Sequence, residues 1–84
     1  MAITIRFPAM LHAAAGTEVV IHDPVKDVAA LLLALERKVP GISTQLSDPI
    51  FNIAVNDEML LHGVRKHPLK DGDTVEIVPT ISGG

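Results

Sequence analysis

The chain has 84 residues, no cysteine and a formal net charge of -3, and 48% of its residues are hydrophobic. This length holds one small domain, and the apolar content excludes an intrinsically disordered chain. The missing cysteines exclude a disulfide framework, a cysteine-based metal site and a cysteine nucleophile, and the acidic balance argues against binding to nucleic acid or to an anionic membrane.

The N-terminal segment predicts a β-hairpin. Residues 3–7 alternate apolar and polar side chains, which is the period of a half-buried strand, and Pro8 ends that strand. Residues 9–16 form a connecting loop, and the β-branched side chains in 17–22 indicate a second strand. Arg6 and Pro8 interrupt the apolar run that a secretory signal requires, and no stretch approaches the roughly 20 apolar residues of a membrane span. We therefore expect a cytoplasmic protein.

The next segment predicts the main helix of the fold. Asp23 is the expected N-cap, because Pro24 suits the first helical position, where its missing N–H costs nothing. The Pro40-Gly41 pair stops the helix. The apolar residues that recur at helical spacing and mark its buried face are Val25, Val28, Ala29, Leu32, Leu35 and Val39.

The second half of the chain predicts a loop and three more strands. Residues 42–49 are expected to be a loop, and Asn56-Asp57 is a turn pair because both residues tolerate left-handed backbone conformations. The three strands are expected at residues 51–55, 58–62 and 74–79.

The element order β-β-α-β-β-β predicts an α+β fold. One helix with a single apolar stripe must cover one face of one sheet. In the simplest arrangement the first and last strands lie parallel at the centre of a mixed sheet of about five strands, which is a β-grasp, the ubiquitin-like roll. We expect residues 1–80 to form this domain and residues 81–84 to form a free C-terminal Gly-Gly tail.

Three stretches resemble one known family. They are "VNDE" at 55–58, "LKDGDTVEIVP" at 69–79 and "SGG" at 82–84. Together they are similar to the ThiS/MoaD family of ubiquitin-like sulfur carrier proteins, whose members share a β-grasp fold, an L-x-D-G-D-x-V turn before the last strand and a terminal Gly-Gly. The resemblance covers essentially the whole chain.

Two branches of this family share features with the chain. Its ending "PTISGG" at 79–84 is similar to the tail of the MoaD branch, the small subunit of molybdopterin synthase. "FPAML" at 7–11 and "NIAVNDE" at 52–58 are closer to the CysO branch, which feeds sulfur to a cysteine synthase. The resemblance therefore implies as sulfur acceptor either a cysteine synthase or the large subunit of molybdopterin synthase.

The resemblance also implies the chemistry of the tail. The carboxylate of Gly84 would be adenylated by a separate activating enzyme that uses ATP, and then converted to a thiocarboxylate that donates sulfur. The chain would be a protein co-substrate rather than an enzyme and would bind no cofactor itself. Gly83 and Gly84 would pass a narrow channel because they lack Cβ atoms. Ile81 and Pro79 would anchor the tail root, and Ser82 would supply a small hydroxyl.

The expected docking surface is the sheet face opposite the helix. Strand alternation places on that face Thr4, Arg6, Ala54, Glu76 and Val78. Their mixed polarity is typical of a surface for transient protein partners.

Two other function classes remain open at this stage. In one, the chain is a ubiquitin-like protein modifier conjugated to lysines through Gly84, and in the other it is a β-grasp binding module with an idle tail. A metal site is not expected, because the four histidines are scattered without metal-ligand spacing.

Overall fold

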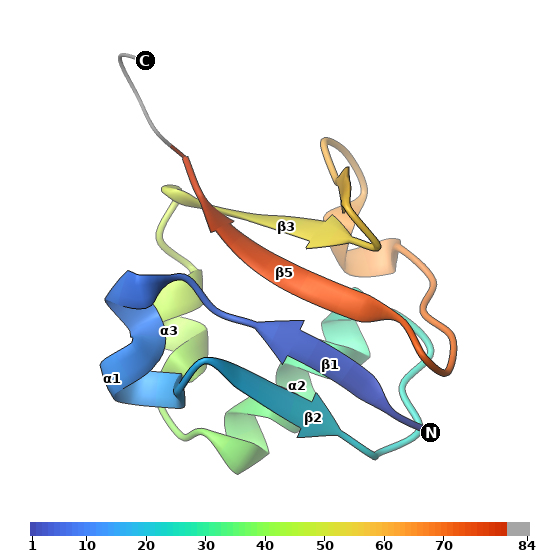
Figure 1. Ribbon diagram of the computed structural model, residues 1–84. Helices are drawn as coiled ribbons and strands as arrows, with labels where there is room; N and C mark the ends of the chain where they lie inside the picture. Colours follow the sequence, from blue (N-terminus) through green and yellow to red (C-terminus); the bar gives the residue numbers. More distant parts are fainter. Residues whose placement is uncertain (81–84) are drawn as a thin grey trace.

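Five strands form one mixed sheet in the computed structural model, which describes residues 1–80 (Figure 1). The strands are β1 (Ile3–Arg6), β2 (Glu18–Ile21), β3 (Phe51–Val55), β4 (Glu58–Met59) and β5 (Thr74–Pro79). Their order is β2-β1-β5-β3-β4, with β1 and β5 parallel at the centre and the other pairs antiparallel. The predicted β-grasp topology is confirmed, although β4 is shorter than the expected strand.

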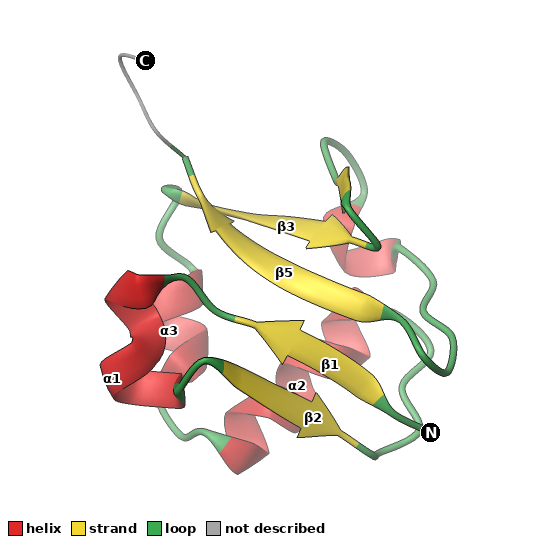
Figure 2. Cartoon of the chain, in the orientation of Figure 1, coloured by secondary structure: helices red, strands yellow, loops and turns green. Residues whose placement is uncertain are grey.

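Most of the helices lie behind the sheet, the helical segment between β1 and β2 lies beside the ends of these two strands, and within residues 1–80 no helix covers the front face (Figure 2). The helical segments are η1 (Ala9–Leu11), α1 (His12–Ala15), α2 (Val28–Lys38), α3 (Ile42–Leu46) and η2 (Val64–Lys66). The core lies between α2 and the back of the sheet. Its most deeply buried side chains are Ile3, Ile5, Ile21, Val28, Leu31, Leu35, Ile42, Val75 and Ile77.

The predicted start of the main helix was wrong. Asp27, rather than Asp23, caps α2, and its carboxylate accepts a hydrogen bond of 2.9 Å from the Ala30 N–H. Asp27 itself has an extended backbone and forms a β-bridge with Pro68, so the helix begins only after it. Asp23 instead forms an exposed ion pair with Arg37 at 3.2 Å. The start of the helix is therefore set by the contact of Asp27 with a segment some forty residues away, and not by the local capping pattern at Asp23 and Pro24.

Two segments expected to be loops contain short helices. Each holds one core side chain: Leu11 is 2% exposed beside α1, and Ile42 is 1% exposed in α3. The start of α3 is capped by Glu36, which belongs to α2 and accepts hydrogen bonds from the N–H groups of Gly41 (2.7 Å) and Ser43 (2.9 Å). These bonds lower the pKa of Glu36. Because the capping side chain belongs to another helix, the residue at the N-cap position of α3 gives no sequence signal that a helix begins there.

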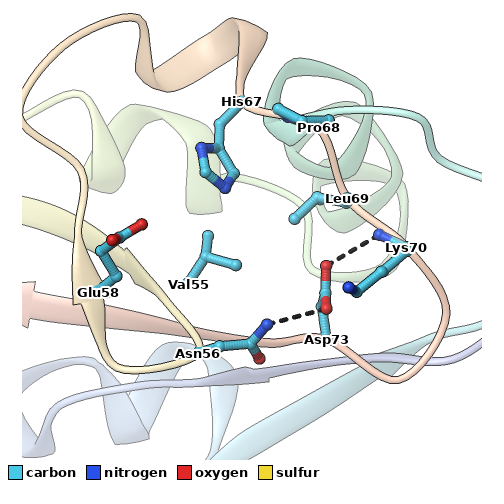
Figure 3. Close-up of a pocket in the computed structure, with 8 residues that line it drawn as sticks. All are labelled: Val55, Asn56, Glu58, His67, Pro68, Leu69, Lys70 and Asp73. Carbon is cyan, nitrogen blue, oxygen red and sulfur yellow. Dashed lines mark hydrogen bonds between the residues drawn. The ribbon is translucent and has the colours of Figure 1, made fainter.

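The turn before β5 is built around one buried carboxylate, that of Asp73, which is 5% exposed. It accepts hydrogen bonds of 2.9 Å from the side-chain amide of Asn56 and from the Lys70 N–H (Figure 3). The Asn56 side-chain oxygen in turn accepts from the Thr74 N–H at 2.9 Å. Asn56 and Asp57 have φ angles of 49° and 71°, so the predicted turn pair is confirmed. Asp73 thereby joins the β3–β4 turn to the start of β5.

The same turn also holds the N-terminal strand. The Gly72 N–H donates to the Ala2 carbonyl at 2.9 Å, and the Thr4 N–H donates to the Asp73 carbonyl at 3.2 Å. Gly72 has a φ of 91°, a conformation that favours glycine. Asp71 accepts a hydrogen bond of 2.8 Å from the Ala2 N–H. The Asp-Gly-Asp motif therefore fastens three strands at one end of the sheet.

The pKa of Asp73 lies below its ordinary value of 3.8. Burial is the largest influence and raises the pKa, but the hydrogen bonds from Asn56 and Lys70, with the charges of Lys70 and His67, together outweigh it. A carboxylate with a lowered folded-state pKa stabilises the fold above its unfolded pKa, and this stabilisation is lost as the pH falls through the folded value.

We predict that Asp73→Ala lowers the free energy of unfolding by about 3 kcal/mol at neutral pH, because two donors lose a charged acceptor. Asp71→Ala is the matched control, since it removes one exposed hydrogen bond and should cost less than about 1 kcal/mol. Urea denaturation of both variants checks the difference. Below the ordinary pKa of 3.8, the gap between wild type and Asp73→Ala should narrow. A gap that is unchanged at acid pH would show that the charge of Asp73 is unimportant.

Candidate functional site

The end of β5 is fixed to the start of β3. Pro79 pairs with Phe51, and the Thr80 N–H donates to the Ile50 carbonyl. The side-chain amide of Asn52 donates to the Thr80 hydroxyl. Whatever follows Thr80 therefore starts from a held point at the edge of the domain. The residues expected to thread and react, Ile81, Ser82, Gly83 and Gly84, lie outside the described residues.

Pro79 lies where an anchor of the tail root was expected. It is half-buried, and its register partner Phe51 packs against the core. Val75, Ile77 and Pro79 share the helix side of β5 by strand alternation. The sequence did not indicate Ile50 and Asn52, which hold Thr80, because their part in the root depends on the pairing of β3 with β5.

The open face of the sheet brings the expected docking residues together. Arg6, Glu76 and Ala54 are neighbours across β1, β5 and β3, and Thr4 and Val78 lie in the adjacent rows. Ala54 is only 6% exposed, so it forms the floor of this face rather than a projecting contact. The predicted grouping on one face is observed, with Arg6 and Glu76 as its exposed charges.

The charges of this face are available to a partner. Arg6 lies between Glu18 on β2 and Glu76 on β5 in the register. Within residues 1–80, the only ion pair joins Arg37 to Asp23, so Arg6 forms none. The face therefore presents one cation and two carboxylates in a row, beside Val78 and the exposed Met59.

A polar pocket of about 400 Å³ lies at the other end of β5 (Figure 3). Its lining includes the apolar side chains of Val55 and Leu69 and the polar ones of Glu58, His67, Lys70 and Asp73. Both carboxylate oxygens of Asp73 already accept structural hydrogen bonds, from the Asn56 side-chain amide and from the Lys70 N–H. This pocket is remote from the tail root, since the length of β5 separates them (Figure 1).

The histidines form no metal centre in the described part of the chain. His12 hydrogen-bonds the Phe7 carbonyl at 2.9 Å, and His22 hydrogen-bonds the Met1 carbonyl at 3.3 Å. Within residues 1–80 no group of three or more histidine, aspartate or glutamate side chains is close enough to hold a metal ion. None of the helices in this range has the length and apolar composition needed to cross a membrane.

The chain is similar to known proteins along essentially its whole length. The model of the ThiS family matches residues 5–84. The sulfur carrier protein CysO of Mycobacterium tuberculosis is 31% identical over 93 residues, which covers all of both chains. A crystal structure of a BexX/CysO complex from Amycolatopsis orientalis aligns with a TM-score of 0.81 and 29% identity, covering 99% of this chain and 100% of that one. The small archaeal modifier protein 1 of Methanosarcina acetivorans aligns with a TM-score of 0.77 and 28% identity, covering 99% and 96%.

We predict that Asn52→Ala loosens the tail root without unfolding the domain. The variant removes one exposed hydrogen bond to Thr80, worth about 1 kcal/mol, so amide exchange at Thr80 should become about fivefold faster. Exchange measured by NMR at the core amides of Ile5 and Ile77 should stay unchanged. Equal acceleration at all three amides would contradict a local role for Asn52.

Proposed function

The chain belongs to the ThiS family, and from this membership we propose that it is a sulfur carrier protein whose reactive group is the carboxylate of Gly84. The observation that carries the proposal is the end-to-end similarity to the sulfur carrier protein CysO. The held position of Thr80, four residues before Gly84, supports it, because it fixes the point on the body from which the proposed reactive segment begins.

The proposed reaction begins with activation of the terminus. A carboxylate is a poor electrophile, because its negative charge and resonance oppose nucleophilic attack. A Gly84 oxygen attacks the α-phosphorus of ATP and displaces pyrophosphate, which leaves an acyl-adenylate. Hydrogen sulfide then attacks the carbonyl carbon, and AMP leaves with the electrons of the C–O bond. A persulfide on a donor protein serves in the same step if a thiol then reduces the acyl disulfide.

The body of the domain does none of this chemistry in the proposal. An adenylating partner of the ubiquitin-activating type binds the ATP, and this chain binds no cofactor. The partner must enclose Gly83 and Gly84 to keep water from the acyl-adenylate. Ile81 and Pro79 anchor the tail root, and Ser82 adds a small hydroxyl between them and the glycines. The chain therefore acts as a co-substrate that delivers sulfur to a second enzyme.

The acceptor in this proposal is a synthase of the cysteine-synthase type. The similarity to CysO favours that branch over the molybdopterin synthase branch. Both partners dock on the open face of the sheet through Arg6, Glu76 and Val78, with Ala54 as its floor. This face supports docking because no helix covers it within the described residues and because Arg6 forms no ion pair there.

A second candidate is a protein modifier joined to lysines through Gly84. The similarity to a small archaeal modifier protein favours it, and both functions start from the same acyl-adenylate. They differ in the nucleophile that follows, which is sulfur in a carrier and a lysine amine in a modifier.

The deciding measurement is the intact mass of the protein after incubation with ATP, a sulfide source and soluble extract of the source organism. We expect one terminal oxygen to be replaced by sulfur, and a variant without Gly83 and Gly84 to stay unchanged. Higher-mass conjugates that need Gly84 would favour the modifier. An unchanged mass, in an extract that converts an added known carrier, would overturn both.

The docking face has its own test. We predict that Glu76→Arg slows thiocarboxylate formation about tenfold at limiting carrier concentration, because a reversed charge opposes the partner's complementary surface. Glu58→Arg is the matched control, since it makes the same charge change on β4 beside the inward-facing Val55. Equal rates of thiocarboxylate formation for the two variants would contradict docking on the open face. Circular dichroism confirms that both remain folded.

A further inference from the structure

The outer edge of β2 (Glu18–Ile21) is not covered by a strand within residues 1–80, because β2 is the last strand of the sheet on that side. The Phe7 N–H donates to the Thr17 carbonyl, so this pair, one residue beyond the paired ends of β1 and β2, stands at a hydrogen-bonded position of the ladder. Hydrogen-bonded pairs alternate with non-hydrogen-bonded pairs in an antiparallel ladder. The backbone N–H and C=O of Val19, which pairs with Ile5, therefore also point toward β1. The backbone groups of Glu18 and Val20 consequently point outward, away from the sheet.

A lysine from the main helix lies across this edge. Lys38 is the last residue of α2, and its ammonium donates a hydrogen bond of 3.2 Å to the Val20 carbonyl. This contact agrees with the outward direction of Val20 derived from the ladder. A positively charged side chain on a sheet edge is one of the devices by which proteins prevent edge-to-edge pairing.

We propose that the edge of β2 is able to pair with the same edge of a second copy of this chain, and that Lys38 prevents this pairing in the natural sequence. A two-fold axis at Val19 sets Glu18 of one copy opposite Val20 of the other. In each of these pairs the N–H of either residue donates to the C=O of the other, so the pair forms two hydrogen bonds. The sheet continues across the two copies in the antiparallel sense.

The edge is complementary to itself in charge as well as in hydrogen bonding. Glu18 meets Val20 in this register rather than a second Glu18, so no like charges oppose each other on the open face. The half-buried Val19 of each copy meets its equivalent across the axis on the helix side. The Val20 carbonyl, one of the acceptors that this pairing needs, already accepts a hydrogen bond from the Lys38 ammonium.

The sheet offers no comparable edge on its other side. There β4 has two residues, Glu58 and Met59, whereas β2 has four. A second copy is therefore the occupant that the β2 edge fits, because one register satisfies the outward groups of both chains. This inference concerns the fold alone and does not rest on the proposed sulfur carrier function.

The test replaces Lys38 by methionine, which keeps an aliphatic side chain but removes the ammonium. Light scattering during size exclusion should show Lys38→Met moving from monomer toward twice the monomer mass as its concentration rises, while the wild type stays monomeric. Arg37→Met is the matched control, because it removes a cation one residue earlier whose partner is Asp23 rather than the β2 edge. It should remain monomeric.

Two further measurements locate the contact. In Lys38→Met the amides of Glu18 and Val20 should exchange more slowly with solvent as the protein concentration rises. Adding Val20→Pro removes an outward N–H without disturbing the ladder to β1, and the double variant should be monomeric. Should it fail to fold, amide exchange in the single variant decides. A monomeric Lys38→Met, a dimer with unprotected Val20 amides, or a wild type that already pairs through this edge would overturn the proposal.

Discussion

The buried carboxylate of Asp73 is the constraint on which the arrangement of the sheet depends. Its hydrogen bonds join the turn before β5 to the β3–β4 turn, and its backbone carbonyl holds β1. A buried charge is costly unless donors surround it, and here Asn56 and the Lys70 N–H provide them. Satisfying this one group therefore fixes the register of the two central strands and of β3 at the same time.

The register of β5 in turn decides where the chain leaves the domain. One end of β5 is fixed by Asp73 and the other by the contacts of Thr80 with Ile50 and Asn52. Between these ends, Val75 and Ile77 face the core, and Glu76 and Val78 face the open side. One strand thus supplies core packing, the proposed partner surface and the root of the proposed reactive tail, and a slip by one residue would exchange its two faces.

Much of this arrangement could be predicted from local patterns, and the errors have a common cause. Strand alternation correctly placed Arg6, Glu76 and Val78 on one face, and the element order led to the observed topology. The sequence could not show that Asp27 would form a bridge with Pro68, or that Glu36 would cap the next helix. It also identified the Asp-Gly-Asp segment only as a turn. Each missed feature depends on a contact between two different elements or turns of the fold, for which local propensity carries no information.

The two exposed parts of the sheet face different physical demands. The face proposed for docking must remain uncovered if successive partners are to reach it. An uncovered edge is hazardous for the same molecule, because backbone donors and acceptors pair with any extended strand. Lys38 resolves this conflict at β2, since it covers the Val20 carbonyl from the helix side and leaves the side chains of Glu18 and Val20 on the open face. An open face and a closed edge can therefore coexist on a strand of four residues.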